Sequence, residues 1–173
     1  HKSGPWASFS HFMAFVQRSS FSLTTLFIES LDLPDSSMVH LLVHVLTLLD
    51  FTFIDTEVPP EQNPITERLI ESLHAYRYRK SSLRLLNGPL LPRLRSLKLT
   101  YNGVYFNDQA VVDMIKSRWT SDFVLSREVD CLRSFTMTYR CRKKALGVYD
   151  VLDHIEKDGM RLVILWKDDL GTE

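Results

Sequence analysis

Leucines at a fixed spacing constrain the fold of this chain more than any other feature. In the clearest copy, leucine stands at positions 94, 97 and 99, and Asn102 follows three residues later. Alternate side chains of a β-strand point to the same face, so Leu97 and Leu99 would enter one core together. The spacing therefore predicts a short strand, buried on one face, that ends near a polar residue.

The pattern returns around Leu26, Leu49 and Phe135. It matches the strand signature of leucine-rich repeats, whose units are about 20–29 residues long. The first two copies lie 23 residues apart, whereas the later offsets are wider and require insertions or a skipped strand. One such unit cannot bury its apolar face alone, so neighbouring units are expected to stack around a continuous core.

Helical patterns lie between the strand signatures. Apolar spacing and turn residues predict helices at 9–16, 38–46, 65–76, 108–119 and 147–158, and a last strand at 160–166. Expected helix starts are Ser8, Asp35 or Ser36, Asn63 before Pro64, and Asn107 or Asp108. Either the second helix ends before Leu46 or the strand around Leu49 starts later. In the last helix, Gly159 is expected to be the C-cap, and the inward side chains are expected to be Val148, Val151, Leu152 and Ile155. The predicted fold class is α/β: an irregular leucine-rich-repeat-like solenoid, with parallel strands on one face and helices on the other. Residues 1–173 are expected to form a single domain, as a fragment of a longer chain.

Composition limits the classes of function. Lys plus Arg and Asp plus Glu both number 21, so the chain has no basic surplus for nucleic acid. No apolar run reaches the ~18 residues of a membrane span. The two cysteines form no disulfide framework and are expected to be reduced thiols in a cytoplasmic or nuclear protein. The basic runs 77–80 and 140–144 are expected to be solvated loops.

Few residue patterns suggest chemistry. His40 and His44 have the i, i+4 spacing of a metal-binding pair, but no Glu follows His40, and both would face solvent. The acidic residues around Asp153 and His154 suit the wet side of a helix. Ser117, Arg118 and Trp119 are expected to play a structural part. No phosphate loop or dinucleotide motif is present, so we expect no catalytic, cofactor or metal residues and no enzyme.

Residues that alternate with the buried positions would form the concave face of the strands, where a protein partner would bind. They are Thr25, Phe27, Glu29, Leu48, Asp50, Thr52, Ser96, Lys98, Thr100, Ser134, Thr136 and Thr138. Exposed Phe27 and Leu48 would be the natural anchors, because binding hot spots favour apolar and aromatic side chains.

A series of motifs, in order along the chain, resembles the C-terminal leucine-rich-repeat region of F-box-type proteins of mushroom-forming fungi. The motifs are Phe12-x-x-Phe15-x-x-Arg18-Ser19, then 22–26, 63–73, 91–97 and 108–119, and the step from Gly159 to Met160. The resemblance covers nearly the whole chain.

The resemblance implies a substrate-recognition module of a ubiquitin ligase subunit. In that family an upstream F-box, absent from these residues, binds a Skp-type adaptor, and the repeats are presumed to hold the substrate. Two alternatives remain: an orphan structural scaffold without its own activity, and a small α/β hydrolase or metal-dependent enzyme that uses His40, His44 or the neighbourhood of Asp153 and His154. In an enzyme these residues would meet at the carboxyl ends of the strands.

Overall fold

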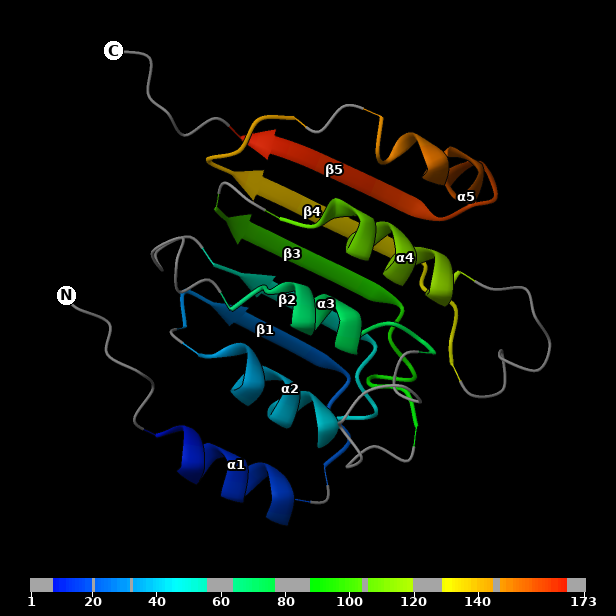
Figure 1. The fold of residues 1–173 in the computed structure, drawn as a ribbon. Helices are drawn as coiled ribbons and strands as arrows, with labels where there is room; N and C mark the ends of the chain where they lie inside the picture. Colours follow the sequence, from blue (N-terminus) through cyan, green and yellow to red (C-terminus); the bar gives the residue numbers. More distant parts are fainter. Residues whose placement is uncertain are drawn as a thin grey trace.

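A computed structural model describes residues 8–19, 21–31, 33–55, 64–76, 88–103, 106–119, 129–144 and 147–167. Helices and strands alternate through these ranges (Figure 1). In chain order they are α1 (Phe9–Arg18), β1 (Thr25–Glu29), α2 (Asp35–Val43), β2 (Asp50–Ile54), α3 (Glu67–Ser72), β3 (Ser96–Asn102), α4 (Asp108–Arg118), β4 (Ser134–Arg140), the 3-10 turn η4 (Asp150–Leu152), α5 (Asp153–Lys157) and β5 (Arg161–Lys167).

The strands form one sheet in the order β1-β2-β3-β4-β5, and every neighbouring pair is parallel. Each strand therefore pairs with the next strand along the chain, and a helix lies between the two in sequence. The helices lie over the same face of the sheet (Figure 1). The structure thus confirms the predicted α/β class with parallel strands, and no helix of the described residues lies over the second face of the sheet.

The sheet register aligns the leucine signature across the strands. Leu97 of β3 lies opposite Phe51 of β2 and Phe135 of β4. These three side chains are at most 1% exposed, and Leu94 and Leu99 are also fully buried. Rows of apolar side chains on the covered face thus pack against the helices, as the spacing predicts, because burial of such side chains is the main favourable term in folding.

The boundary between the second helix and the second strand is now resolved. Helix α2 ends at Val43 and β2 begins at Asp50, so residues 44–49 form the connection. Leu48 lies in this connection and is fully buried. Leu48 was expected as an exposed anchor on the strand face, and that expectation is wrong because the residue precedes the strand and packs into the core.

Helix starts follow the prediction only in part. Asn107 caps α4, since its side chain accepts a hydrogen bond from the amide of Ala110. In contrast, Ser8 precedes α1 without a side-chain capping bond, and α2 begins at Asp35 behind Pro34, so neither Asp35 nor Ser36 is its N-cap. Helix α3 begins at Glu67 behind a Thr66 cap, which overturns the expected start at Pro64; Asn63 lies outside the described residues.

The last helix is shorter than expected. The predicted helix over 147–158 is reduced to η4 and α5, and Val151, expected to point inward, is 47% exposed. The 3-10 turn at η4 winds more tightly than an α-helix and shifts the inward face by the time the chain reaches α5. Leu152 and Ile155 remain the buried side chains, and Gly159, with a φ of 107°, ends the helix as predicted.

Arg118 explains the tripeptide at the end of α4. Its guanidinium is fully buried and donates hydrogen bonds to the backbone carbonyls of Leu73, Leu90 and Leu91. Burial lowers the pKa of Arg118 to about 10, so the group remains charged at neutral pH. One side chain thereby joins α4 to the end of α3 and to the segment before β3, which is the structural part that the sequence indicated.

Candidate functional site

The uncovered face of the sheet collects the side chains that alternate with the buried rows. Three rows cross all five strands, as the register shows. From β1 to β5 they are Thr25-Asp50-Ser96-Ser134-Arg161, then Phe27-Thr52-Lys98-Thr136-Val163, then Glu29-Ile54-Thr100-Thr138-Leu165. All the strand residues predicted for the concave face, Leu48 apart, therefore lie on this uncovered strand face.

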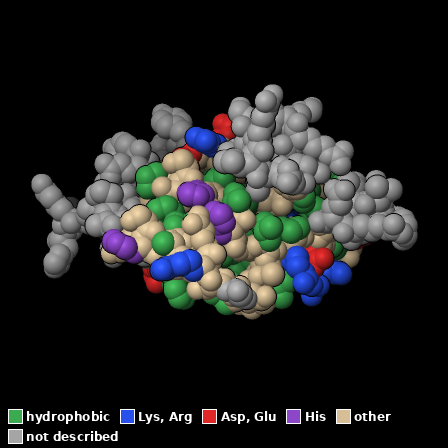
Figure 2. Space-filling model, turned by 90° about the horizontal axis from the view of Figure 1, so that it is seen from below, with side chains coloured by type: hydrophobic (Ala, Val, Ile, Leu, Met, Phe, Trp, Pro, Cys, Tyr) green, Lys and Arg blue, Asp and Glu red, His purple; other side chains and the backbone are tan. Residues whose placement is uncertain are grey.

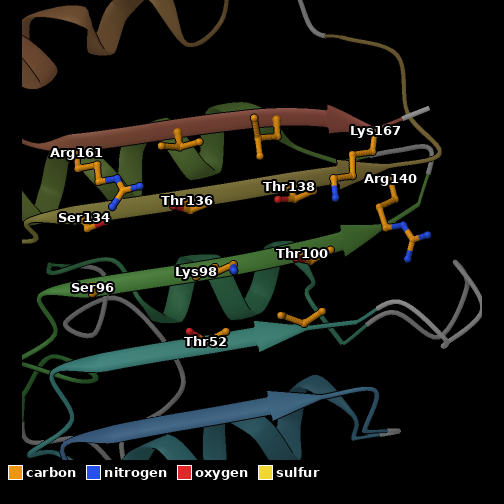
Figure 3. A pocket seen from close by; sticks show the side chains of 13 residues that line it. Thr52, Ser96, Lys98, Thr100, Ser134, Thr136, Thr138, Arg140, Arg161 and Lys167 are labelled. Carbon is orange, nitrogen blue, oxygen red and sulfur yellow. The ribbon is translucent and has the colours of Figure 1, made fainter. Parts of the chain in front are cut away.

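A broad hollow of about 720 Å³ covers the part of this face that β2 to β5 provide (Figure 3). Seven of its lining residues are among those predicted from the sequence: Thr52, Ser96, Lys98, Thr100, Ser134, Thr136 and Thr138. The predicted residues Thr25, Phe27, Glu29 and Asp50 lie on the same face, outside the hollow, towards the edge strand β1.

Hydroxyl groups form the floor of the hollow. Thr136 is half-buried, whereas Thr100 and Thr138 are only 6% and 7% exposed, although both point into the hollow (Figure 3). Their exposure is low because the larger side chains of Ile54 and Leu165 flank these two threonines in the same row. The floor is thus polar and close-set, and a ligand would touch the threonine hydroxyls from above.

Charges divide the uncovered strand face into two halves. The carboxylates Glu29 and Asp50 lie on β1 and β2, and both are exposed. The cations lie on the other three strands: Lys98, Arg140, Arg161 and Lys167. No acidic residue projects onto this face from β3, β4 or β5. An otherwise neutral chain therefore presents a local positive field at one half of its sheet.

Large apolar side chains stand at opposite edges of the face. Phe27 on β1 is 58% exposed, as the sequence indicated, and Leu165 on β5 is 44% exposed. The second exposed large apolar side chain of this face is thus Leu165 and not Leu48, which is buried. An exposed aromatic or aliphatic side chain beside polar groups is a common anchor for a partner protein.

Sequence reasoning missed the contribution of β5 and the ends of two strands. The hollow is also lined by Ile54, Arg140, Arg161, Val163, Leu165 and Lys167. Strand β5 reads as an uninterrupted apolar run from Leu162 to Trp166, so hydrophobicity alone does not separate its two faces. The charged residues at its ends, Arg161 and Lys167, share one parity with Val163 and Leu165, and that parity was the available signal.

A second polar cluster lies at the carboxyl ends of β3 and β4. The buried carboxylate of Asp108, at the start of α4, accepts hydrogen bonds from the hydroxyls of Tyr139 (3.0 Å) and Tyr149 (2.8 Å). The guanidinium of Arg142 binds both carboxylate oxygens of Asp108. The expectation that run 140–144 is a solvated loop is therefore wrong for Arg142, because a tertiary ion pair holds its side chain; run 77–80 lies outside the described residues.

The electrostatics of this Asp108 cluster favour a structural role. Burial is the main cause that raises the pKa of Tyr139 and of Tyr149, and the Asp108 carboxylate raises both further. Burial would lower the pKa of Arg142, but the hydrogen bond and charge of Asp108 outweigh it and raise the pKa. Both phenols are thus protonated donors at neutral pH, and the Asp108 carboxylate accepts hydrogen bonds from both of them and from Arg142.

The residues of the enzyme alternative do not converge. His40 on α2 and His44, which directly follows that helix, are exposed, with their rings 5.3 Å apart. Asp153 and His154 are exposed on α5, at the other end of the sheet (Figure 1). Figure 2 shows the molecule from below, with histidines among interspersed hydrophobic and polar side chains. Within the described ranges, no three His, Cys, Asp or Glu side chains come close enough to hold a metal ion.

The thiols and the helices add no further site. Cys131 and Cys141 are half-buried and form no disulfide within the described residues. None of the helices in the described part of the chain is long and apolar enough to cross a bilayer.

Comparisons with known proteins leave the uncovered strand face as the basis for assigning a function. No protein-family model matches the chain, and neither a curated protein nor a solved structure matches it. Function therefore has to be inferred from the residues that the fold presents to solvent.

Proposed function

We propose that this chain is a protein-interaction module that binds a protein partner on its uncovered strand face. One observation carries the proposal: in the described part of the chain, parallel strands in chain order have their helices on one side, and the other side offers aligned, solvent-facing side chains. In most proteins, a parallel sheet with helices on one face also has its other face covered, by helices or by a second sheet. Here that face is polar, hollowed and bordered by Phe27 and Leu165, which suits reversible recognition.

The architecture is best described as an irregular leucine-rich-repeat-like solenoid. Sequential parallel strands, apolar rows in register and one helical layer support this description. The long offsets between the strand signatures become the connections between β2 and β3 and between β3 and β4. Solenoids of this kind present extended binding surfaces because each unit contacts only its neighbours.

The module serves, in this proposal, as the substrate-recognition part of an F-box-type ubiquitin ligase subunit. The resemblance of the motif order in this sequence to such proteins of mushroom-forming fungi supports this step. In that arrangement the uncovered strand face holds the substrate, and a Skp-type adaptor binds elsewhere through an F-box. The module itself contributes recognition and no chemistry.

Affinity purification of the full-length parent protein, followed by mass spectrometry, tests both levels of the proposal. We expect a Skp-type adaptor and a cullin to co-purify, together with a further protein. Thr136→Trp places a bulky side chain in the hollow and should remove the further protein while the adaptor stays bound. The matched control, Glu156→Trp, puts the same side chain on exposed α5 and should retain both.

Two results would count against the proposal separately. Absence of adaptor and cullin from the purified material would remove the ligase assignment. Unchanged capture of the further protein by Thr136→Trp, with an unchanged circular dichroism spectrum, would remove the uncovered strand face as the binding surface.

A further inference from the structure

We propose that the half of the uncovered strand face formed by β3, β4 and β5 binds an extended acidic segment of the partner protein. This half is called the basic half below, and it comprises the face residues of those three strands. The inference rests on the proposed function, since it names the chemistry that the same face would recognise.

Three cations of the basic half make no ion pair within the described part of the chain. Lys98, Arg161 and Lys167 are exposed, and none of them makes an ion pair with another described residue. Figure 3 shows their side chains, together with Arg140, around the hydroxyl floor of the hollow. Elsewhere in the described chain, Arg95 and Arg142 do have carboxylate partners. Charged groups left open around one hollow are available to a ligand of opposite sign.

The spacing of these cations selects a long ligand over a small anion. Arg161 and Lys167 lie at the two ends of β5, six residues apart, which corresponds to about 20 Å along a strand. A single carboxylate or phosphate contacts only one end. An extended peptide of about six residues spans the whole distance and can place an acidic side chain near each cation.

The floor between the cations suits a peptide. Ser134, Thr136 and Thr138 offer hydroxyls that both donate and accept hydrogen bonds, so they can pair with carboxylates and with peptide backbone alike. Val163 and Leu165 supply apolar contact beside them on β5. The ligand that fits these groups has acidic side chains at intervals and an apolar side chain between them.

The other half of the face sets a boundary. Glu29 and Asp50 would repel an acidic segment that extended over β1 and β2, so repulsion as well as attraction fixes where the segment lies. Phe27, on the acidic half, would then contact a different part of the partner.

A protein segment suits the basic half better than nucleic acid or lipid does. Single-stranded nucleic acid binds through aromatic stacking in addition to cations, and no aromatic side chain projects from the basic half. The formal net charge of the whole chain is zero, which gives little general attraction for a phosphate backbone. The hydroxyl floor offers no broad apolar surface to a bilayer.

Fluorescence anisotropy with defined probes tests the inference on the full chain. The probe is a fluorescein-labelled peptide of about ten residues, in which glutamate alternates with serine and one leucine stands at the centre. We expect it to bind, and we expect a peptide with lysine in place of glutamate not to bind. Lys98→Glu and Arg161→Glu should each weaken binding about tenfold, whereas Asp50→Lys should strengthen it.

Matched controls place the same charge change outside the face. Lys116→Glu on α4 and Lys157→Glu on α5 are exposed and should leave the affinity unchanged. Circular dichroism of each variant checks that the fold is retained. Equal weakening by the control variants would show a nonspecific effect of net charge and would overturn the inference. Tighter binding of a single-stranded oligonucleotide of equal length would also overturn it, in favour of nucleic acid.

Partner capture separates failure of this inference from failure of the proposed function. If Thr136→Trp abolishes capture by the full-length protein while Lys98→Glu and Arg161→Glu retain it, the acidic ligand is wrong and the interaction module stands. Loss of capture with all three variants supports both. Capture retained by all three removes both.

Discussion

The two faces of the sheet arise from the same five strands and differ in almost every property. On the covered face, Leu97, Phe135 and Met137 are at most 1% exposed and pack under the helices. One residue away, Lys98 is exposed and Thr136 is half-buried. The pleat alone separates the positions that stabilise the fold from those free to bind, so changes on one face need not disturb the other.

Two cations, Arg118 of α4 and Lys98 of β3, differ in burial in the same way. Arg118 is fully buried, and three backbone carbonyls accept its hydrogen bonds. Lys98 has the same formal charge but faces water in the hollow. A buried charge needs hydrogen-bond partners within the fold, whereas an exposed charge is hydrated and remains available to a ligand. Four predictions test this difference between buried and exposed side chains, in order of decreasing effect on stability.

Replacing Arg118 with methionine should destabilise the fold most. All three carbonyls would lose the guanidinium donor, and within the described residues only that of Leu91 would keep another one, the amide of Leu94. We therefore expect a loss of about 4–5 kcal/mol in the free energy of unfolding. Urea denaturation measures it. Lys116→Met, an exposed position on the same helix, should change stability by less than about 0.5 kcal/mol. A small effect at Arg118 would mean that water or other donors replace the guanidinium.

Neighbouring alanine substitutions on β4 compare the two faces directly. Phe135→Ala removes a fully buried ring and should cost about 3–4 kcal/mol, through lost burial and the cavity left behind. Thr136→Ala, one residue along, should cost less than about 0.5 kcal/mol. Similar losses at both positions, measured by the same urea titration, would contradict a bare strand face.

Alkaline pH should reveal the buried phenol of Tyr149. Its pKa in the folded state is raised above that of the unfolded chain, so its stabilising contribution is complete below about pH 10 and decreases as the pH rises further. Tyr149→Phe should therefore be about 1 kcal/mol less stable at pH 7, because a hydrogen bond to Asp108 is lost. Above about pH 10 that gap should close by about 1.4 kcal/mol per pH unit.

Denaturation at several pH values, with Thr136→Ala as the control, measures this closing gap. The control should parallel the wild type throughout, because Thr136 does not contact the Asp108 cluster. A gap that stays constant between pH 9 and 11 would show that the phenol is not held in its neutral form.

The smallest effect is expected at the ion pair between Arg95 and Asp130, which precede β3 and β4. The two groups are 2.9 Å apart, but the side chains are 52% and 31% exposed. A double-mutant cycle with alanine should give a coupling of about 0.2–1 kcal/mol that falls as salt is added. A coupling free energy as large as the stability lost in Arg118→Met would contradict the view that a buried, hydrogen-bonded charge contributes more to stability than an exposed ion pair.

Local patterns predicted the parts of the fold that local physics controls. The leucine spacing placed β3 and β4, and Asn107 was correctly expected to start α4. These features depend on strand alternation and on a side chain that reaches an amide three residues away. The Pro64 start failed because Thr66 caps α3, and its hydroxyl also bonds Asp35 of α2, a contact that no local pattern contains.

The candidate site was predicted less completely for a related reason. Alternation correctly assigned Lys98, Thr136 and Thr138 to the uncovered face, because the leucine spacing of each strand identifies its inward positions and therefore also its outward ones. It misplaced Leu48, which precedes β2 and is buried. It did not identify Arg161 and Lys167, because the two faces of the apolar edge strand β5 look alike in sequence.

The sequence by itself determined which side chains of β1 to β4 point inward, because the period of a strand is two residues whatever surrounds it. The repeat pattern also predicted parallel strands stacked in chain order, and the sheet has that order. The tertiary structure alone decided which charges come together. Only the parallel pairing of β3, β4 and β5 gathers Lys98, Arg140, Arg161 and Lys167 around one hollow. Only the packing of α4 brings Arg118 to the carbonyl of Leu73, 45 residues away. Such contacts form between groups distant in the chain, and their partners are selected by burial and geometry rather than by neighbouring sequence.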